Sequence, residues 1–244
     1  MVIEKGGVYR YDALASTNET AKEKAKNGAP RATVIIADSQ TAGRGRRGRG
    51  FYSCEGGVFM SFVLRPRFAV TAAAITTAAA VVVCDAVRAA AGRDCRIKWV
   101  NDVLLDGKKI CGILTEAVPG DGAVILGVGI NVALDGGFPE GLRRSAGAIF
   151  PDGADARLKK DVKDRLIGYL IGAFADFPDK TPYEDVMAEY RRLSAVIGRE
   201  VTVIAPAGEY AAFAEDIDGA GRLMVRTADG TSEALSSGEI SVRL

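Results

Sequence analysis

Histidine is absent from the 244 residues of the sequence. Its absence excludes Ser-His-Asp triads, histidine general bases and histidine metal ligands. The sequence also has almost no net charge, because 32 lysines and arginines face 31 aspartates and glutamates. A chain with a formal charge of +1 has no overall field that attracts nucleic acid or an anionic membrane, so such binding would need a local patch.

Cysteine is scarce, and its spacing fits neither a disulfide framework nor a C-x-x-C pair. The four cysteines are Cys54, Cys84, Cys95 and Cys111. Structural zinc sites use closely spaced Cys or His ligands, so we expect no zinc site and free thiols in a reducing compartment. The N-terminal residues lack the apolar segment of a signal peptide. The longest apolar stretch, residues 70–84, is shorter than the roughly 20 residues that span a bilayer, so we expect a soluble, cytoplasmic protein without a membrane partner.

Capping signals and 3.6-residue periodicity predict four helices. Ser16 and Glu19 fit a capping box that opens the first helix. Residues 71–91 predict a helix that is apolar nearly all round and therefore buried. A third helix is expected over about residues 155–176. A fourth is expected to begin at a second capping box, Thr181-Pro182-Tyr183-Glu184, and to end at Gly198.

The strand pattern predicts a largely antiparallel sheet. Asp106-Gly107 is a type I′ turn dipeptide between two apolar runs, which indicates a hairpin. The strands expected in this region and before it cover residues 33–37, 58–64, 103–105, 108–117 and 123–132. After Gly198 the sequence changes to short strands with Gly-containing turns, which predicts a small appended barrel. We therefore expect an α/β domain over residues 1–197 and a second domain over 198–244.

The most unusual segment is the Gly/Arg stretch of residues 43–50, in which four arginines alternate with four glycines. Arginine supplies a planar fork of donors that stays charged, and glycine lets backbone N–H groups turn toward an anion. A phosphate- or carboxylate-binding loop, a nucleic-acid contact and a solvated basic turn all fit this composition. Its place between two strand-like runs favours a folded ligand-binding loop.

A second cluster, Lys98-Trp99-Val100-Asn101-Asp102, stands just before the predicted hairpin. Asn and Asp could equally begin a turn. On the following strand, two-residue alternation predicts that Lys109 and Cys111 share a face, and Gly112 marks a close approach to the backbone. The two glycines of Gly127-Val128-Gly129 also interrupt a predicted strand. They weaken it and make a close contact with a ligand plausible.

Taken together, these motifs resemble the biotin protein ligases in order and spacing. They are Ser16-Thr17-Asn18, the segment from Gln40 to Arg49, residues 98–102, the segment from Lys108 to Glu116, and residues 127–131. The resemblance covers about residues 8–244 and implies a mixed sheet flanked by helices, followed by an SH3-like C-terminal domain. Phe51, Cys54 and Val100 depart from the family, which usually has Trp, Pro and Pro at these positions.

The resemblance implies that biotin attacks the α-phosphate of ATP, forms biotinyl-5′-AMP and is passed to a lysine of a biotin carboxyl carrier protein. Two anions must meet, so cations have to stabilise the developing charge; the implied catalytic residues are Arg44, Arg46 and Lys109. The implied biotin-binding residues are Ser16, Thr17, Asn18, Gln40, Gly43, Arg44, Gly45, Arg46, Lys109, Gly112 and Gly127. The implied ATP-binding residues are Arg44, Arg46, Arg49, Phe51, Asn101, Asp102, Lys109 and Asn131. Magnesium would enter with ATP, without a fixed protein site.

Two other functions compete with this hypothesis. A lipoate or octanoate ligase has a related fold, but it relies on an Arg-Arg-x-Ser-Gly-Gly-Gly loop and a nearby His-Asp that this sequence lacks. A nucleic-acid-binding module could use the Gly/Arg stretch, but the net charge of +1 disfavours it. Only 15 residues precede Ser16, too few for the N-terminal DNA-binding domain of some biotin ligases, so we expect no DNA partner. Dimers are common in that family, so we expect a homodimer.

Overall fold

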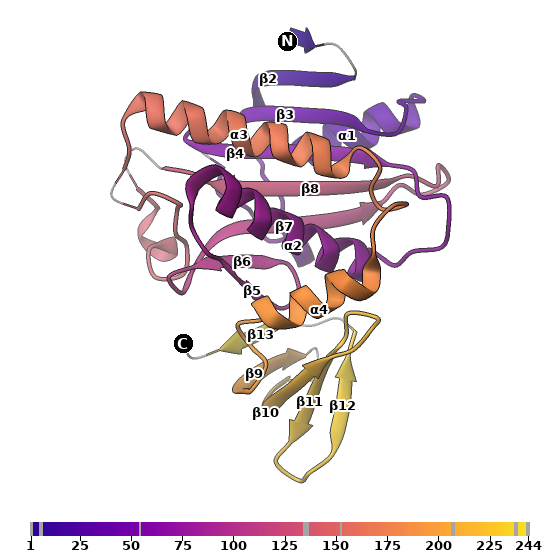
Figure 1. Ribbon diagram of the computed structural model, residues 1–244, viewed down its shortest axis with the longest axis vertical. Helices are drawn as coiled ribbons and strands as arrows, with labels where there is room; N and C mark the ends of the chain where they lie inside the picture. Colours follow the sequence, from indigo (N-terminus) through magenta and orange to yellow (C-terminus); the bar gives the residue numbers. More distant parts are fainter. Residues whose placement is uncertain are drawn as a thin grey trace.

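The computed structural model describes residues 2–4, 7–53, 55–133, 137–151, 153–205, 208–236 and 239–242. Its larger sheet has eight strands in the order β1-β2-β3-β4-β8-β7-β6-β5 (Figure 1). Only β2 and β3 pair in parallel, and the other neighbours are antiparallel. The strands are β1 Val2–Glu4, β2 Val8–Leu14, β3 Thr33–Gln40, β4 Gly57–Leu64, β5 Arg96–Lys98, β6 Asp102–Leu105, β7 Lys108–Ala117 and β8 Val124–Asn131. This confirms the predicted mixed, largely antiparallel sheet.

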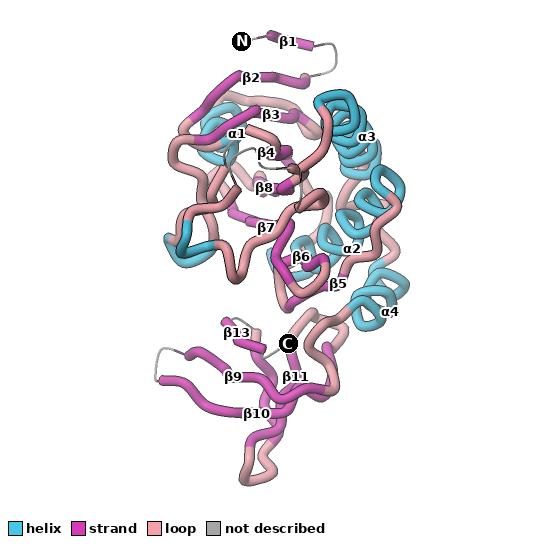
Figure 2. Tube along the Cα trace, turned by 90° about the vertical axis from the view of Figure 1, so that its left-hand side faces the viewer, coloured by secondary structure: helices cyan, strands magenta, loops and turns pink. Residues whose placement is uncertain are grey.

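Helices cover both faces of this sheet (Figure 2). They are α1 Thr17–Lys26, α2 Ala72–Ala91, α3 Ala156–Phe174 and α4 Tyr183–Leu193. Successive side chains of β3 point to opposite faces of the sheet, so the strand packs against helices on both sides. Val34 and Ile36 join the core with α2, α3 and α4, whereas Ile35 packs with Ala21 and Ala25 of α1 on the opposite face.

Helix α2 is the most apolar element, as the sequence predicts. With 20 residues it is longer than the apolar run at 70–84 and meets the length and composition of a membrane span. However, 61% of its most apolar window is buried inside the fold. Thr71 caps its first turn by accepting a hydrogen bond from the Ala74 N–H, and Gly92 ends it in the left-handed conformation. Helix α2 is therefore a buried core helix that packs on the sheet and lies between α3 and α4 in one layer (Figure 2).

Both predicted capping boxes are wrong. Ser16 is the N-cap residue of α1, but its side chain makes no capping hydrogen bond, and Glu19 pairs instead with Lys22 and Arg44. Helix α4 begins after Pro182, also without a side-chain cap. It ends at Leu193 instead of Gly198, because the Ala195 N–H donates to the Ile97 carbonyl and thereby joins the chain to β5. At α1 the tertiary partner Arg44 therefore engages the expected capping residue Glu19, and at α4 the contact with β5 follows the early end of the helix.

The predicted hairpin between β6 and β7 is confirmed, with φ of 50° at Asp106 and 77° at Gly107. The register shifts within this pair, because Val103 pairs with Cys111 whereas Leu104 pairs with Lys109. Ile110 is the extra residue of this β-bulge.

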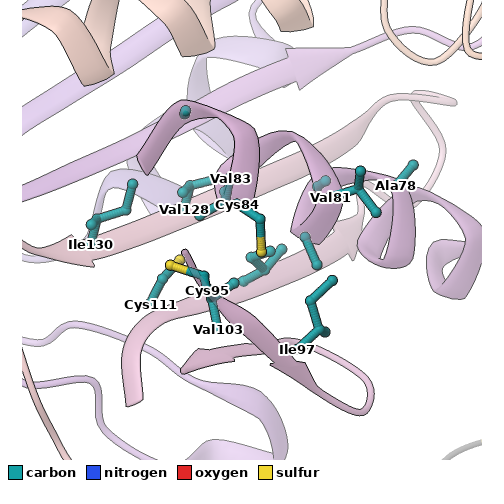
Figure 3. Packing of buried hydrophobic residues seen from close by; sticks show 14 of the residues in the cluster. Ala78, Val81, Val83, Cys84, Cys95, Ile97, Val103, Cys111, Val128 and Ile130 are labelled. Atoms are coloured by element: carbon teal, nitrogen blue, oxygen red, sulfur yellow. The ribbon is translucent and has the colours of Figure 1, made fainter. Parts of the chain in front are cut away.

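The bulge overturns the prediction that Lys109 and Cys111 share a face. The Lys109 ammonium lies 3.2 Å from the position that a Cβ would take on Gly112. The Cys111 side chain instead enters the core, where Cys84 and Cys95 also lie (Figure 3). These three cysteines are free and buried, as expected, and Cys54 lies outside the described residues.

The C-terminal residues form a separate five-stranded antiparallel sheet in the order β12-β11-β10-β9-β13. Its strands are β9 Arg199–Ala205, β10 Gly208–Ile217, β11 Leu223–Thr227, β12 Ser232–Leu235 and β13 Glu239–Val242. The sheet lies beside β5 and α4 (Figure 1). Two hydrogen bonds join it to the larger part, from Trp99 Nε1 to the Gly221 carbonyl at 2.9 Å and from Arg191 Nε to the Ile217 carbonyl at 2.6 Å.

Candidate active site

Two neighbouring cavities open beside the Gly/Arg stretch. The first has a volume of about 160 Å³ and lies between the start of α1, the arginine loop (residues 43–50), and strands β7 and β8. The second has a volume of about 540 Å³ and reaches toward residues 138–146. The residues that line both are Arg49, Gly50, Phe51, Lys98, Asp102 and Lys109. Charged groups are therefore concentrated where the two cavities meet.

The arginine loop is folded, as its place between two strands predicts. The Gly45 N–H donates to the Arg49 carbonyl at 2.7 Å, and the Phe51 N–H donates to the Gly43 carbonyl at 2.8 Å. Arg47 turns the chain with a φ of 55°. Gly43 lines neither cavity, unlike the other ten residues expected to bind biotin. A Cβ there would lie 2.4 Å from the Phe51 carbonyl oxygen, so Gly43 allows the loop to close.

A buried polar network forms one end of the first cavity. Gln40 Oε1 accepts hydrogen bonds from the Thr17 N–H at 2.8 Å and from the Thr17 hydroxyl at 3.2 Å, and Gln40 Nε2 donates to Ser53 Oγ at 2.9 Å. Asn18 is bonded to Ser61 and Glu116, at 2.6 Å and 2.8 Å. These contacts hold Thr17, Asn18 and Gln40 at the cavity wall, where Ser16 also lies.

Sequence reasoning did not assign Ser61 or Glu116 to the site. Ser61 is fully buried in β4, whose neighbouring residues are apolar, and this polar interruption was the available signal. Glu116 ends the Lys108–Glu116 motif. Burial opposes ionisation of Glu116, but hydrogen bonds from Lys22 and Asn18 outweigh it and lower the pKa of the carboxyl group. A negative charge therefore lies behind the polar end of the cavity.

Lys109 and Arg46 lie at the opposite, charged end of the first cavity. The Lys109 ammonium is 2.7 Å from Asp102 Oδ1 and 5.7 Å from the centre of the Phe51 ring. Arg46 Nη1 donates to Asn101 Oδ1 at 3.2 Å, and Asn101 Nδ2 donates in turn to the Ile113 carbonyl at 3.1 Å. The third predicted cation, Arg44, lines the same cavity and pairs with Glu19. The structure thus brings the three predicted catalytic residues to one cavity.

Three glycines leave the sheet without side chains under the first cavity. Gly112 and Gly129 pair across β7 and β8, and a Cβ on either would lie within 2.8 Å of the Phe51 ring. A Cβ on Gly127 would lie 2.2 Å from Asn18 Oδ1. The glycines therefore admit Phe51 and Asn18 to a sheet surface that larger residues would close. Gly129 was not among the predicted site residues, although its motif was identified.

The second cavity has an apolar wall next to polar groups. The rings of Tyr52 and Phe138 lie 6.1 Å apart, and Leu142 also lines the wall. Asn131, predicted to bind ATP, lines this cavity only. Its Nδ2 donates to the Gly147 carbonyl at 2.9 Å, whereas its buried Oδ1 has no hydrogen-bond partner among the described residues. The wall residues that sequence reasoning missed include Tyr52, Phe138, Leu142 and Arg144, whereas Lys98 belongs to a motif that was identified.

Comparisons with known proteins identify the relatives of this chain. Residues 11–135 match the Biotin/lipoate A/B protein ligase family, and residues 196–243 match the Biotin protein ligase C terminal domain. The chain is 34% identical to a bifunctional ligase/repressor of Bacillus subtilis, covering 93% of this chain and 71% of that protein. It is 33% identical to a biotin--[acetyl-CoA-carboxylase] ligase of Mycobacterium tuberculosis, covering 96% and 89%. Among solved structures, the biotin protein ligase from Aquifex aeolicus in complex with biotin and ATP matches with a TM-score of 0.77 and 25% identity, over 98% of this chain and 99% of that one.

Proposed function

Since the chain belongs to the biotin/lipoate A/B protein ligase family, and within it to the biotin protein ligases, we propose that it joins biotin to a lysine of a biotin carboxyl carrier protein at the expense of ATP. The single observation that carries this proposal is the arrangement of two cavities that meet at Lys109. One cavity ends in the hydrogen-bonding side chains of Thr17, Asn18 and Gln40, and the other has an aromatic wall. Biotin fits the cavity with the hydrogen-bonding side chains, and a nucleotide fits the cavity with the aromatic wall.

In the first step, a carboxylate oxygen of biotin forms a bond to the α-phosphorus of ATP. The bond between that phosphorus and the bridging oxygen to the β-phosphate breaks, and pyrophosphate leaves. Lys109 lines both cavities and Arg46 lines the first, so they offset the repulsion between the anions and the charge that develops on the phosphoryl oxygens. Holding both reactants in one geometry supplies much of the remaining rate.

In the second step, the amine of the carrier lysine attacks the carbonyl carbon of biotinyl-5′-AMP. An amide bond forms, the bond to the phosphate oxygen breaks, and AMP leaves as the amine loses a proton. Neither step requires histidine, which this chain lacks.

We place ATP in the second cavity as its magnesium complex. Tyr52 and Phe138 offer ring faces to the adenine, and Arg49 faces the phosphates. Asn131 Oδ1 and Asp102 supply oxygen acceptors on the same wall, which suit the cation that ATP brings with it. Within the residues that the structure describes, no three Cys, Asp or Glu side chains are grouped to hold a metal of their own.

The proposal is tested by measuring pyrophosphate release from MgATP with biotin, lipoate or octanoate as the acid. We expect release that depends on biotin and is absent with the other two. Release driven by octanoate or lipoate, but not by biotin, would support the rival ligase of related fold.

Replacing Gly127 with alanine should weaken biotin binding strongly. The new Cβ would lie 2.2 Å from Asn18 Oδ1, which is backed by Ser61, so the Asn18 side chain has to move. Loss of its hydrogen bonds should lower biotin affinity at least about tenfold in calorimetry. Gly168→Ala is the control, because nothing lies within 4 Å of that position. Parent-like biotin affinity in Gly127→Ala would show that Asn18 does not bind biotin.

We propose that residues 1–197 bind biotin and ATP, and that residues 198–244 act on the site through Trp99. The Trp99 indole bonds to Gly221, and the Tyr190 hydroxyl donates to the Val100 carbonyl at 3.1 Å. The next residues, Asn101 and Asp102, contact Arg46 and Lys109. The C-terminal sheet thus supports the charged end of the site, and none of its described residues lines either cavity.

Substituting Trp99 with phenylalanine should therefore raise the KM for ATP about three- to tenfold, the effect of one lost hydrogen bond. Trp99 lines the first cavity, and phenylalanine keeps an aromatic ring on that wall while leaving the polar network intact. Biotin affinity should therefore stay within about twofold of the parent. Steady-state kinetics and calorimetry measure the two quantities. An equal loss in both would contradict this division of labour.

We further propose that the enzyme is a cytoplasmic homodimer that does not bind DNA. The near-neutral charge of the chain supports the last point. Analytical ultracentrifugation, cell fractionation and DNA filter binding at physiological salt test the three statements separately.

A further inference from the structure

We propose that Glu116 sets the specificity of the biotin site by fixing the orientation of the Asn18 amide, so that Asn18 presents a hydrogen-bond acceptor to a ureido N–H of biotin. The inference rests on the proposed function for the identity of the ligand. It makes Glu116 a positioning residue, since the carboxylate acts through Asn18.

Asn18 is held on both sides of its amide and is only 4% exposed. Its Nδ2 donates to Glu116 Oε2 at 2.8 Å and lies 3.4 Å from the Leu114 carbonyl oxygen. Its Oδ1 accepts from the Ser61 hydroxyl at 2.6 Å. Ser61 Oγ also lies 2.8 Å from Thr17 Oγ1. With the Ser61 proton directed to Asn18, each hydrogen bond of the Asn18 side chain pairs a donor with an acceptor.

Glu116 is the group that decides which arrangement this is. The Ser61 hydroxyl both donates and accepts, so it would tolerate either orientation of the amide. An ionised carboxylate only accepts, and Lys22, 2.8 Å from Glu116 Oε1, keeps a positive charge beside it. The amide nitrogen of Asn18 must therefore face Glu116, and the amide oxygen must face away.

The oxygen that faces away lies over the floor of the first cavity. Asn18 Oδ1 is the atom nearest to a Cβ placed on Gly127, and both residues line the cavity. An amide oxygen has two lone pairs, and Ser61 occupies one of them. The other is available to a ligand that carries an N–H.

A cyclic urea offers two such donors, whereas the hydrocarbon chain of octanoate and the dithiolane of lipoate offer none. A ligand without the donor would leave a buried amide oxygen desolvated beside apolar atoms. Sites that reserve a buried polar group for a ligand partner discriminate strongly against ligands that lack it.

The first test is the affinity of Glu116→Gln for biotin, measured by calorimetry without ATP. Glutamine has the same shape but can also donate, so it no longer forces the Asn18 amide into one orientation. We expect the Kd to rise about tenfold or more. The kcat at saturating biotin should change less than about twofold, because Glu116 touches no reacting atom. Glu23→Gln on the exposed face of α1 is the matched charge control and should bind biotin like the parent.

The second test is a swap of donor and acceptor. In Asn18→Asp combined with Glu116→Gln, the new carboxylate accepts from the new amide and still presents an oxygen to the cavity. The swap keeps one negative charge in the network, now on residue 18 instead of residue 116, so it should restore biotin affinity to within about threefold of the parent. Biotin methylated on one ureido nitrogen provides a further probe, because methylation removes one N–H donor of the ligand. One of the two methylated isomers should bind the parent weakly and show no further loss in Glu116→Gln.

Three results would overturn the inference. They are a folded Glu116→Gln variant with parent affinity, a swap that binds no better than that single variant, and parent protein that tolerates methylation of either nitrogen. A parent that does not bind biotin at all would instead refute the proposed function.

Discussion

Replacing Lys109 with methionine should slow biotinyl-AMP formation severely while leaving the fold intact. The Lys109 ammonium is the cation that lines both cavities on β7 and lies 2.7 Å from Asp102. Methionine retains the length of the side chain and removes its charge at the point where the carboxylate meets the α-phosphate. Loss of such a contact costs about 2–4 kcal/mol of transition-state stabilisation. Pyrophosphate release should therefore slow roughly 30- to 1,000-fold.

Lys108→Met provides the matched control, since Lys108 is the adjacent, exposed lysine and lines neither cavity. Its rate should equal that of the parent. Near-normal pyrophosphate release by Lys109→Met would remove Lys109 from the chemical step.

Replacing Arg46 with glycine should make the enzyme release its activated intermediate. Arg46 lines the first cavity and is held by Asn101, which is itself bonded to the Ile113 carbonyl. From this position its forked donors can hold the oxygens of the mixed anhydride, which must stay bound and dry until the carrier arrives. Each charge-assisted hydrogen bond contributes about 1.5–3 kcal/mol, so release should become roughly ten- to a hundredfold faster.

The observable result is that Arg46→Gly still consumes ATP but biotinylates a bystander protein, such as albumin, in the same tube. Arg47→Gly removes the same charge from the same loop, at an exposed residue that also borders the first cavity and has a φ of 55°, which glycine accommodates well. It should label only the carrier. Parent-like selectivity in Arg46→Gly would make this arginine a solvated charge, and complete loss of adenylate would assign it to the chemical step.

Much of the fold was predictable because its signals are local. The turn at Asp106-Gly107 needs residues that adopt positive φ, and the apolar α2 could only be buried. The arginine loop and the glycines of β7 and β8 stood out for the same reason, since their composition is unusual for a loop and for strands. These segments meet at the two cavities.

The errors come from pairings between distant segments. The bulge at Ile110 depends on how β6 and β7 align, and it sends Lys109 to the cavity and Cys111 to the core. The capping residue Glu19 pairs with Arg44, 25 residues away, and Asn18 meets Glu116 across 98 residues. A local pattern contains no information about such partners, which is why the network behind the polar end of the cavity became visible only in the structure.

The most direct test of the account is to incubate the protein with biotin, MgATP and a biotin carboxyl carrier domain, and to weigh the carrier by mass spectrometry. The account predicts the mass increment of one biotin on a single lysine, with AMP and pyrophosphate as the other products. An unmodified carrier after complete incubation, with protein that is folded and monodisperse, would contradict it.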